Sequence, residues 1–124
     1  MSQSTPVVAA VDDDHRVRKS VQSVLESAGY EALTFESAEA FLRSGILARV
    51  VCVLADVRLP GIDGLELQHR IRSVRPTLPV IFMTAHDDDD IRQRAQRDGA
   101  AAFMVKPFDG GELLEHIARA VTLG

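Results

Sequence analysis

The sequence predicts an α/β protein in which five parallel strands alternate with five helices in a doubly wound sheet of strand order 2-1-3-4-5. Short β-branched runs alternate five times with segments of helical periodicity. Three of these runs are apolar throughout, which is typical of strands buried on both faces. The chain has 124 residues, of which 46% are hydrophobic and 26% charged, so residues 1–124 are expected to fold as a single domain.

The expected strands and helices can be bounded by apolar periodicity and by turn residues. The strands are expected at residues 7–11, 31–35, 50–55, 80–83 and 102–105. The helices are expected near residues 17–28, 38–44, 64–74, 91–98 and 113–121. Asp14 and Ser37 are candidate N-caps, because their side-chain oxygens can accept hydrogen bonds from first-turn amides. Gly29, Gly45 and Gly99 stand where helices are expected to end.

Charge and hydropathy exclude several classes of protein. The net charge of −4, without a basic cluster, argues against direct binding of nucleic acid. The apolar runs are too short to cross a bilayer, and the first residues lack the basic and apolar regions of a signal peptide. We therefore expect a cytoplasmic protein without membrane contact. Cys52, the one cysteine, lies in an apolar run and is expected to be buried rather than reactive.

Polar residues follow four of the predicted strands at their carboxyl ends. They are, in strand order, Asp12 and Asp13, then Asp56, Thr84 and Lys106. In a doubly wound sheet, ligands bind outside the carboxyl ends of the strands, where the strand order reverses. With the order 2-1-3-4-5 this point lies between the first and third strands. We therefore expect the five side chains to converge on one pocket.

The residue types in this pocket favour a metal ion and phosphoryl chemistry. Three carboxylates in one pocket repel one another unless a cation is present. Hard oxygen ligands select Mg²⁺, Mn²⁺ or Ca²⁺, and no His/Cys set has zinc spacing. A carboxylate can also accept a phosphoryl group as an aspartyl phosphate, whose oxygens a metal and a lysine can neutralise. Lys106 is one of two lysines, and Pro107 after it indicates a fixed peptide, with a cis bond as one option.

Other acidic and histidine residues have structural interpretations. Asp14 is assigned to capping the first helix, which leaves Asp12 and Asp13 for the metal. The run Asp87–Asp90 is interpreted as a cap followed by a solvated first turn that complements the helix dipole. The four histidines are scattered without ligand-spaced partners, and His86 alone lies near the predicted pocket.

Four motifs, in this order and spacing, resemble the receiver domain of bacterial two-component response regulators. They are Val11–Asp14, Leu54–Gly64, Met83–Ala85 and Phe103–Phe108. The Asp-x-Arg-x-Pro form after the third strand, with residues 37–42, is closest to the FixJ-like branch. The resemblance covers about residues 7–121. It implies the flavodoxin-like (βα)5 fold, a Mg²⁺ cofactor for which Mn²⁺ could substitute, and phosphorylation by a sensor histidine kinase.

The resemblance implies a role for each acidic residue of the pocket. Asp56 would be the phosphoacceptor. Asp13, Asp56 and the backbone carbonyl of Arg58 would bind Mg²⁺ directly, while Asp12 would act mainly through a metal-bound water.

The resemblance also implies a switch. Thr84 and Lys106 would contact the phosphoryl oxygens, and Phe103 would turn inward once Thr84 moves toward the phosphate. Arg58 and His86 look like the positions that tune phosphoryl lifetime in relatives. The residue types alone do not indicate whether they lengthen or shorten that lifetime. If Phe103 were a plain core aromatic, it would keep one buried rotamer in both states.

The switch implies partners beyond the kinase. The surface of the fourth helix, fifth strand and fifth helix is expected to change shape and to form a homodimer contact after phosphorylation. FixJ-like receivers are usually joined to a DNA-binding domain, which these 124 residues do not include, so the chain is either a fragment of a longer regulator or a stand-alone receiver. For a fragment, the expected output is transcription through the DNA-binding domain.

Three alternatives are weaker. A haloacid-dehalogenase-like phosphohydrolase would carry Asp-x-Asp at the nucleophile, whereas Arg58 stands at the second position here. A nucleotide-binding protein needs a Gly- or Ser/Thr-rich loop after the first strand, where this chain has three aspartates. A degenerate receiver used only for protein contacts would not need Asp13, Asp56, Thr84 and Lys106 together.

Overall fold

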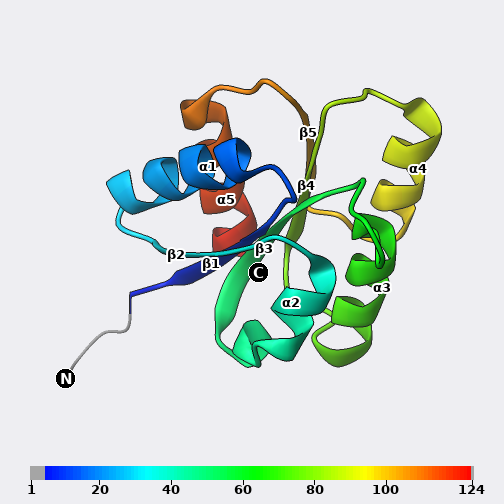
Figure 1. Ribbon diagram of the computed structural model, residues 1–124, viewed down its shortest axis with the longest axis horizontal. Helices are drawn as coiled ribbons and strands as arrows, with labels where there is room; N and C mark the ends of the chain where they lie inside the picture. Colours follow the sequence, from blue (N-terminus) through cyan, green and yellow to red (C-terminus); the bar gives the residue numbers. More distant parts are fainter. Residues whose placement is uncertain (1–4, 124) are drawn as a thin grey trace.

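A five-stranded parallel sheet forms the centre of the molecule, as predicted. In the computed structural model, which describes residues 5–123, its order is β2-β1-β3-β4-β5 (Figure 1). The strands are β1 (Val7–Val11), β2 (Glu31–Phe35), β3 (Val50–Asp56), β4 (Val80–Thr84) and β5 (Ala102–Val105). Residues 1–4 and 124 lie outside the described residues. The predictions about a signal peptide and about the domain boundaries depend in part on these residues.

Five helices and one short 3-10 segment connect and flank the strands. They are α1 (His15–Ser27), α2 (Ala38–Arg43), η1 (Ile46–Ala48), α3 (Gly64–Val74), α4 (Asp89–Arg97) and α5 (Gly110–Leu123). The 3-10 segment was not predicted. The third and fourth strands each extend one residue further than expected, because Asp56 pairs with Met83 and Thr84 pairs with Val105. None of the helices within residues 5–123 is long and apolar enough to span a membrane.

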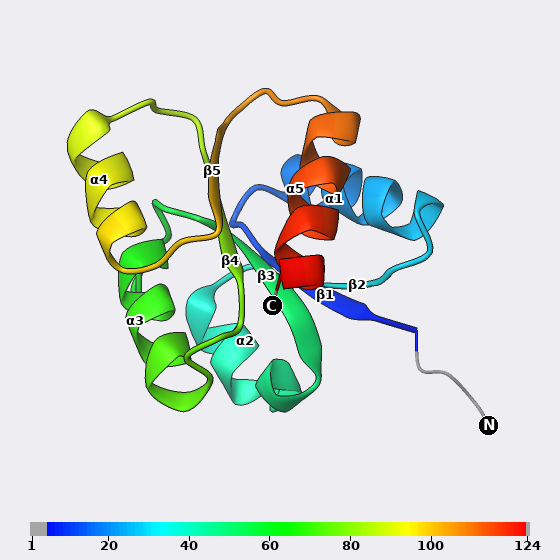
Figure 2. The same cartoon turned by 180° about the vertical axis from the view of Figure 1, so that it is seen from behind.

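The helices cover both faces of the sheet. Figures 1 and 2 show α1 and α5 together on one face and α2, α3 and α4 on the other. Because side chains alternate along a strand, β3 sends Cys52 and Leu54 to the α1–α5 face and Val53 and Ala55 to the opposite one. Burial on both faces explains the continuous apolar runs. Cys52 is buried as predicted, and burial raises the pKa of its thiol to about 12.

Acidic and hydroxyl side chains begin several helices, as predicted. Asp14 accepts a hydrogen bond from the Arg16 amide at 2.9 Å, and Ser37 accepts one from the Ala40 amide at 3.0 Å. Asp88 is the N-cap of α4, which explains much of the acidic run 87–90.

Polar side chains of α3 hold the C-terminal end of α4. Gln68 is buried, and its Nε2 donates to the carbonyl oxygens of Ala95 at 3.4 Å and Asp98 at 3.2 Å. Arg72 also donates to the Asp98 carbonyl. The Ala95 carbonyl also accepts from the Ala100 amide, so these side-chain bonds chiefly join α3 to the last turn and C-cap of α4.

The start of α3 packs directly against the end of β3. The backbone N–H of Gly64 donates to the carbonyl of Val57 at 2.9 Å. A Cβ atom on Gly64 would overlap the backbone of Asp56 and would lie 2.9 Å from the Cα of Val57. Only glycine therefore lets α3 begin beside the last residue of β3.

We expect Gly64→Ala to lower the free energy of unfolding by about 2 kcal/mol, because two backbone segments must separate to admit the methyl group. Urea unfolding followed by circular dichroism measures this. The matched control is Gly111→Ala in the first turn of α5, where the new Cβ atom would meet only the Asp109 carboxylate. That change should be neutral or gain up to about 1 kcal/mol from helix propensity. Equal effects of the two substitutions would contradict the packing argument.

Candidate metal and phosphoryl site

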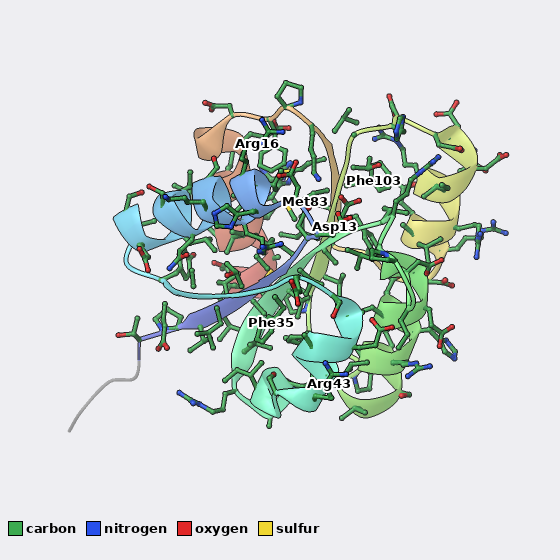
Figure 3. The ribbon with its side chains drawn as sticks, in the orientation of Figure 1. Asp13, Arg16, Phe35, Arg43, Met83 and Phe103 are labelled. Atoms are coloured by element: carbon green, nitrogen blue, oxygen red, sulfur yellow. The ribbon has the colours of Figure 1, made fainter. Side chains whose placement is uncertain are left out.

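Three carboxylates meet at the carboxyl ends of β1 and β3. Asp12 and Asp13 follow β1, and Asp56 is the last residue of β3. One oxygen from each carboxylate lies within 4.8 Å of the other two. Asp12 and Asp56 are buried, whereas Asp13 is exposed, and Figure 3 shows Asp13 at this end of the sheet. The parallel register, with Val11 opposite Ala55, places the ends of the two strands side by side.

Lys106 brings a cation into the same cluster from the loop after β5. Its Nζ lies 2.7 Å from Oδ2 of Asp12 and 2.8 Å from Oδ2 of Asp56. The Lys106–Pro107 peptide bond is cis, the option noted from the sequence. The backbone N–H of Lys106 donates to the Thr84 carbonyl at 2.6 Å, which ties the ends of β4 and β5 together.

The electrostatics of the cluster favour binding of a further cation. Burial raises the pKa of the Asp12 carboxyl, and its hydrogen bond with Lys106 offsets this only in part. Burial alone would lower the pKa of the Lys106 ammonium, but hydrogen bonds to Asp12 and Asp56 outweigh it and raise that pKa. Three carboxylates thus face one ammonium. This set of hard oxygen donors with excess negative charge fits a divalent ion such as Mg²⁺.

Hydrogen bonds fix the loops that carry the carboxylates. Oδ1 of Asp56 accepts from the Arg58 amide at 2.9 Å, and Oδ1 of Asp12 accepts from the Asp14 amide at 2.9 Å. The Arg18 guanidinium donates to the Asp12 backbone carbonyl at 2.7 Å. Sequence analysis missed Arg18, because nothing in the spacing of α1 indicates which of its basic residues turns back toward the loop.

Thr84 lies at the end of β4, beside β3, and is buried. Its Oγ1 accepts from the His86 amide and donates to the His86 carbonyl, both at 3.1 Å. The His86 side chain is exposed, as is that of Arg58. The structure therefore brings Asp12, Asp13, Asp56 and Lys106 together, while the hydroxyl of Thr84 is engaged with its own loop.

Phe103 lies on the α4 side of β5, as Figure 3 shows. Its ring is half-buried, with the Arg92 guanidinium 4.8 Å from the ring centroid and the Phe82 ring centroid 6.4 Å away. Phe103 also packs against the core cluster on this face of the sheet, which includes Phe82 and Ala95.

An open groove of about 460 Å³ lies next to Lys106. It is bounded by α1 and by the loop after β5, with lining residues that include Arg16, Val17, Ser20, Pro107 and Phe108. Of the charged cluster, Lys106 alone lines this groove.

Comparison with known proteins gives the class of the fold and site. Residues 8–118 match the family model described as response regulator receiver domain. The transcriptional regulatory protein FixJ of Bradyrhizobium diazoefficiens is 36% identical over 114 residues, which are 92% of this chain and 56% of FixJ. The transcriptional regulator NtrC of Escherichia coli K12 is 38% identical over 116 residues, 94% of this chain and 25% of NtrC. The chain therefore spans about half or less of these relatives.

Solved structures of receiver domains share the fold of this chain. A CheY-like receiver domain protein from Methanospirillum hungatei has a TM-score of 0.89 at 27% identity, covering 97% of this chain and 96% of that one. The response regulator StyR has a TM-score of 0.87 at 38% identity, covering 97% and 61%. This chain belongs to the response regulator receiver domain family, whose members act as phosphorylation-dependent switches with an acidic Mg²⁺ pocket.

We expect Lys106→Met to lower the free energy of unfolding by about 2 kcal/mol at pH 7 without Mg²⁺, because buried carboxylates lose their cation. The loss should shrink as the pH falls, because burial raises the pKa of the Asp12 carboxyl and protonation removes its charge. In the wild type, the raised pKa of Lys106 makes its contribution present below the ordinary lysine pKa and lost as the pH rises through the raised value.

Urea unfolding at pH 5 and pH 7 measures this effect. The matched control is Lys19→Met, which removes the one other lysine of the sequence from an exposed position on α1. Equal stabilities of the Lys106 variant and the wild type at pH 7 would contradict a stabilising role for the Lys106 ion pairs.

Proposed function

We propose that this chain is a phosphoacceptor domain that takes a phosphoryl group from a sensor histidine kinase on Asp56, in a Mg²⁺-dependent reaction. The observation that carries this proposal is the meeting of three carboxylates and one ammonium around Asp56. Membership of the receiver family supports it.

Each residue of the cluster has a defined task in this reaction. Mg²⁺, when bound, would neutralise charge on the phosphoryl oxygens. Asp13 and the carbonyl of Arg58 would hold it together with Asp56, and Asp12 would act mainly through a metal-bound water. The carboxylate of Asp56 attacks phosphorus, and the bond between phosphorus and the kinase histidine breaks. Lys106 would follow the phosphoryl group, because its ammonium already lies 2.8 Å from the accepting carboxylate.

The switch begins with the added charge. A phosphoryl group brings up to about two negative charges to Asp56. Thr84 would exchange its bonds to His86 for a phosphoryl oxygen, which vacates space beside β5. Phe103 could then leave Arg92 and fill that space. This biases a pre-existing equilibrium of the α4–β5–α5 surface rather than creating a new fold.

The kinase and the output complete the proposal. The groove between α1 and the loop after β5 is open beside Lys106, so a phosphohistidine donor can approach there. The relatives FixJ and NtrC are transcriptional regulators longer than this chain. We therefore propose control of transcription through a separate DNA-binding domain, with the receiver itself acting in the cytoplasm and making no direct contact with nucleic acid or membrane.

We expect acetyl phosphate with Mg²⁺ to add one phosphoryl group to the wild type, seen by intact mass spectrometry. Asp56→Asn should abolish the added mass, because an amide oxygen is a poor nucleophile. The matched control is Asp63→Asn, which alters the exposed cap of α3 in the following loop and should leave the added mass unchanged.

A phosphorylated Asp56→Asn variant would contradict the assignment of the phosphoacceptor. Incubation with p-nitrophenyl phosphate and Mg²⁺ distinguishes the receiver from the phosphohydrolase alternative, because sustained turnover would favour an enzyme over a switch.

Asp13→Ala should raise the Kd for Mg²⁺ by about tenfold or more, and an unchanged Kd would refute the role of Asp13 as a ligand.

We expect beryllofluoride with Mg²⁺ to shift the protein from monomer toward dimer, because the α4–β5–α5 surface then takes its active form. Multi-angle light scattering measures the mass. Asp56→Asn under the same conditions is the control and should stay monomeric. An unchanged mass of the wild type, together with NMR shifts that prove beryllofluoride binding, would remove the dimer from the proposal and leave the phosphorylation chemistry in place.

A further inference from the structure

Glu39, in the first turn of α2, reaches the loop that follows the phosphoacceptor strand. Its Oε2 accepts a hydrogen bond from the backbone N–H of Ile62 at 3.1 Å. The side chain is half-buried, and Oε1 is shielded from solvent without a hydrogen-bond partner in the part of the chain that the structure describes. An unsatisfied, shielded carboxylate oxygen costs free energy. Glu39 therefore makes the hydrogen bond to Ile62 with one carboxylate oxygen while its other oxygen is unsatisfied.

The Glu39–Ile62 hydrogen bond has a charged acceptor. The pKa of the Glu39 carboxyl lies below its ordinary value, chiefly because the Ile62 N–H donates to it. The Glu39 backbone N–H and the positive charges of Arg43 and Arg70 add to this effect, against an opposing contribution from burial. At neutral pH the group is therefore a carboxylate, and a hydrogen bond to an ionised acceptor is roughly twice as strong as a neutral one.

The loop of residues 57–63 has few other hydrogen bonds that fix its middle. At its base, the Val57 amide donates to Met83 at 3.2 Å and the Gly64 amide donates to Val57. Further along, the Arg58 amide donates to Asp56 itself. Among residues 5–123, Glu39 is the one acceptor outside this loop and Asp56 for an amide of residues 58–62. Glu39 therefore supplies the one hydrogen bond from another element to the middle of this loop, in addition to the packing of the buried Leu59 side chain.

The loop backbone is shaped to receive the Glu39 carboxylate. Gly61, which precedes Ile62, has φ of +74°, a left-handed conformation that favours glycine. A Cβ atom at Gly61 would also overlap the carboxylate of Glu39. The backbone angle therefore favours glycine next to the bonded amide, and a side chain there would displace the Glu39 carboxylate.

We propose that Glu39 is a positioning residue for the phosphoacceptor site. By holding the Ile62 N–H, Glu39 keeps the loop in the conformation from which the Arg58 carbonyl would reach a metal ion bound by Asp13 and Asp56. Glu39 touches neither the metal nor the phosphoryl group and acts through the backbone between them. This inference rests on the proposed function, in which the Arg58 carbonyl is a metal ligand.

Glu39→Ala removes the acceptor and should loosen the loop. In the metal-free protein, the Ile62 amide should exchange with solvent about tenfold faster, measured by NMR. By calorimetry, the Kd for Mg²⁺ should rise about threefold to tenfold, less than for loss of a direct ligand. The Mg²⁺ concentration that half-saturates phosphorylation by acetyl phosphate should rise by the same factor, while the rate at saturating Mg²⁺ stays within about twofold.

Two further variants separate the hydrogen bond from the charge. Glu39→Gln keeps an acceptor oxygen at the same reach and should recover most of the Mg²⁺ affinity. Glu36→Ala removes a carboxylate from an exposed position three residues earlier and should leave the Kd for Mg²⁺ unchanged. If Glu39→Ala fails to fold, Glu39→Asp keeps the charge, withdraws the carboxylate by one methylene, and should raise the Kd in the same direction.

A wild-type Kd for Mg²⁺ and wild-type Ile62 exchange in Glu39→Ala would overturn the positioning role. Equal impairment of the Ala and Gln variants would also overturn it, because charge rather than the hydrogen bond would then be responsible. Failure of the proposed function would give a different result from failure of the positioning role. A wild-type protein that takes no phosphoryl group would end that function, whereas Mg²⁺ affinity and Ile62 exchange would still decide the role of Glu39.

Discussion

The Lys106 ammonium between the carboxylates of Asp12 and Asp56 is the interaction on which the rest of the site depends. Parallel strands β1 and β3 end side by side, so their acidic residues converge within 4.8 Å. Like charges at this separation repel one another strongly where water is scarce. A cation supplied by the chain offsets that repulsion in part and leaves a negative excess. The fold thus both creates the unfavourable charge and provides the place where a divalent ion relieves it.

The same lysine couples the pocket to the far edge of the sheet. Its side chain bonds to Asp12 after β1 and to Asp56 of β3, while its backbone amide donates to Thr84 at the end of β4. A change of charge at Asp56 therefore alters forces on β5 and on the loop that leads into α5. No long pathway is required, because Lys106 both contacts the proposed phosphoacceptor Asp56 and directly follows β5, the strand that carries the proposed switch residue Phe103.

The topology, the helix caps and the convergence of acidic residues could be predicted from the sequence because each depends on local patterns. Strands that are buried on both faces have continuous apolar sequences. Asp14 precedes a helix at the spacing that an N-cap requires. The contacts of Arg18, Gln68 and Glu39 could not be predicted in this way. Each joins a side chain to the backbone of another segment, and for Gln68 and Glu39 that segment is more than twenty residues away. Helical periodicity gives the face of such a residue but not the amide or carbonyl that it meets.

The two ends of α4 are held in different ways, and this bears on how a signal could leave the pocket. At the C-terminal end, Gln68 and Arg72 from α3 bind its last carbonyls, and Gln68 is buried. At the N-terminal end, Arg92 contacts the half-buried ring of Phe103 and pairs with exposed Asp87 at 2.5 Å. Exposed ion pairs contribute little to stability. In the proposed switch, a rearrangement that starts at Thr84 would reach this end of α4 first, because the segment leaving Thr84 leads into the Asp88 cap of α4.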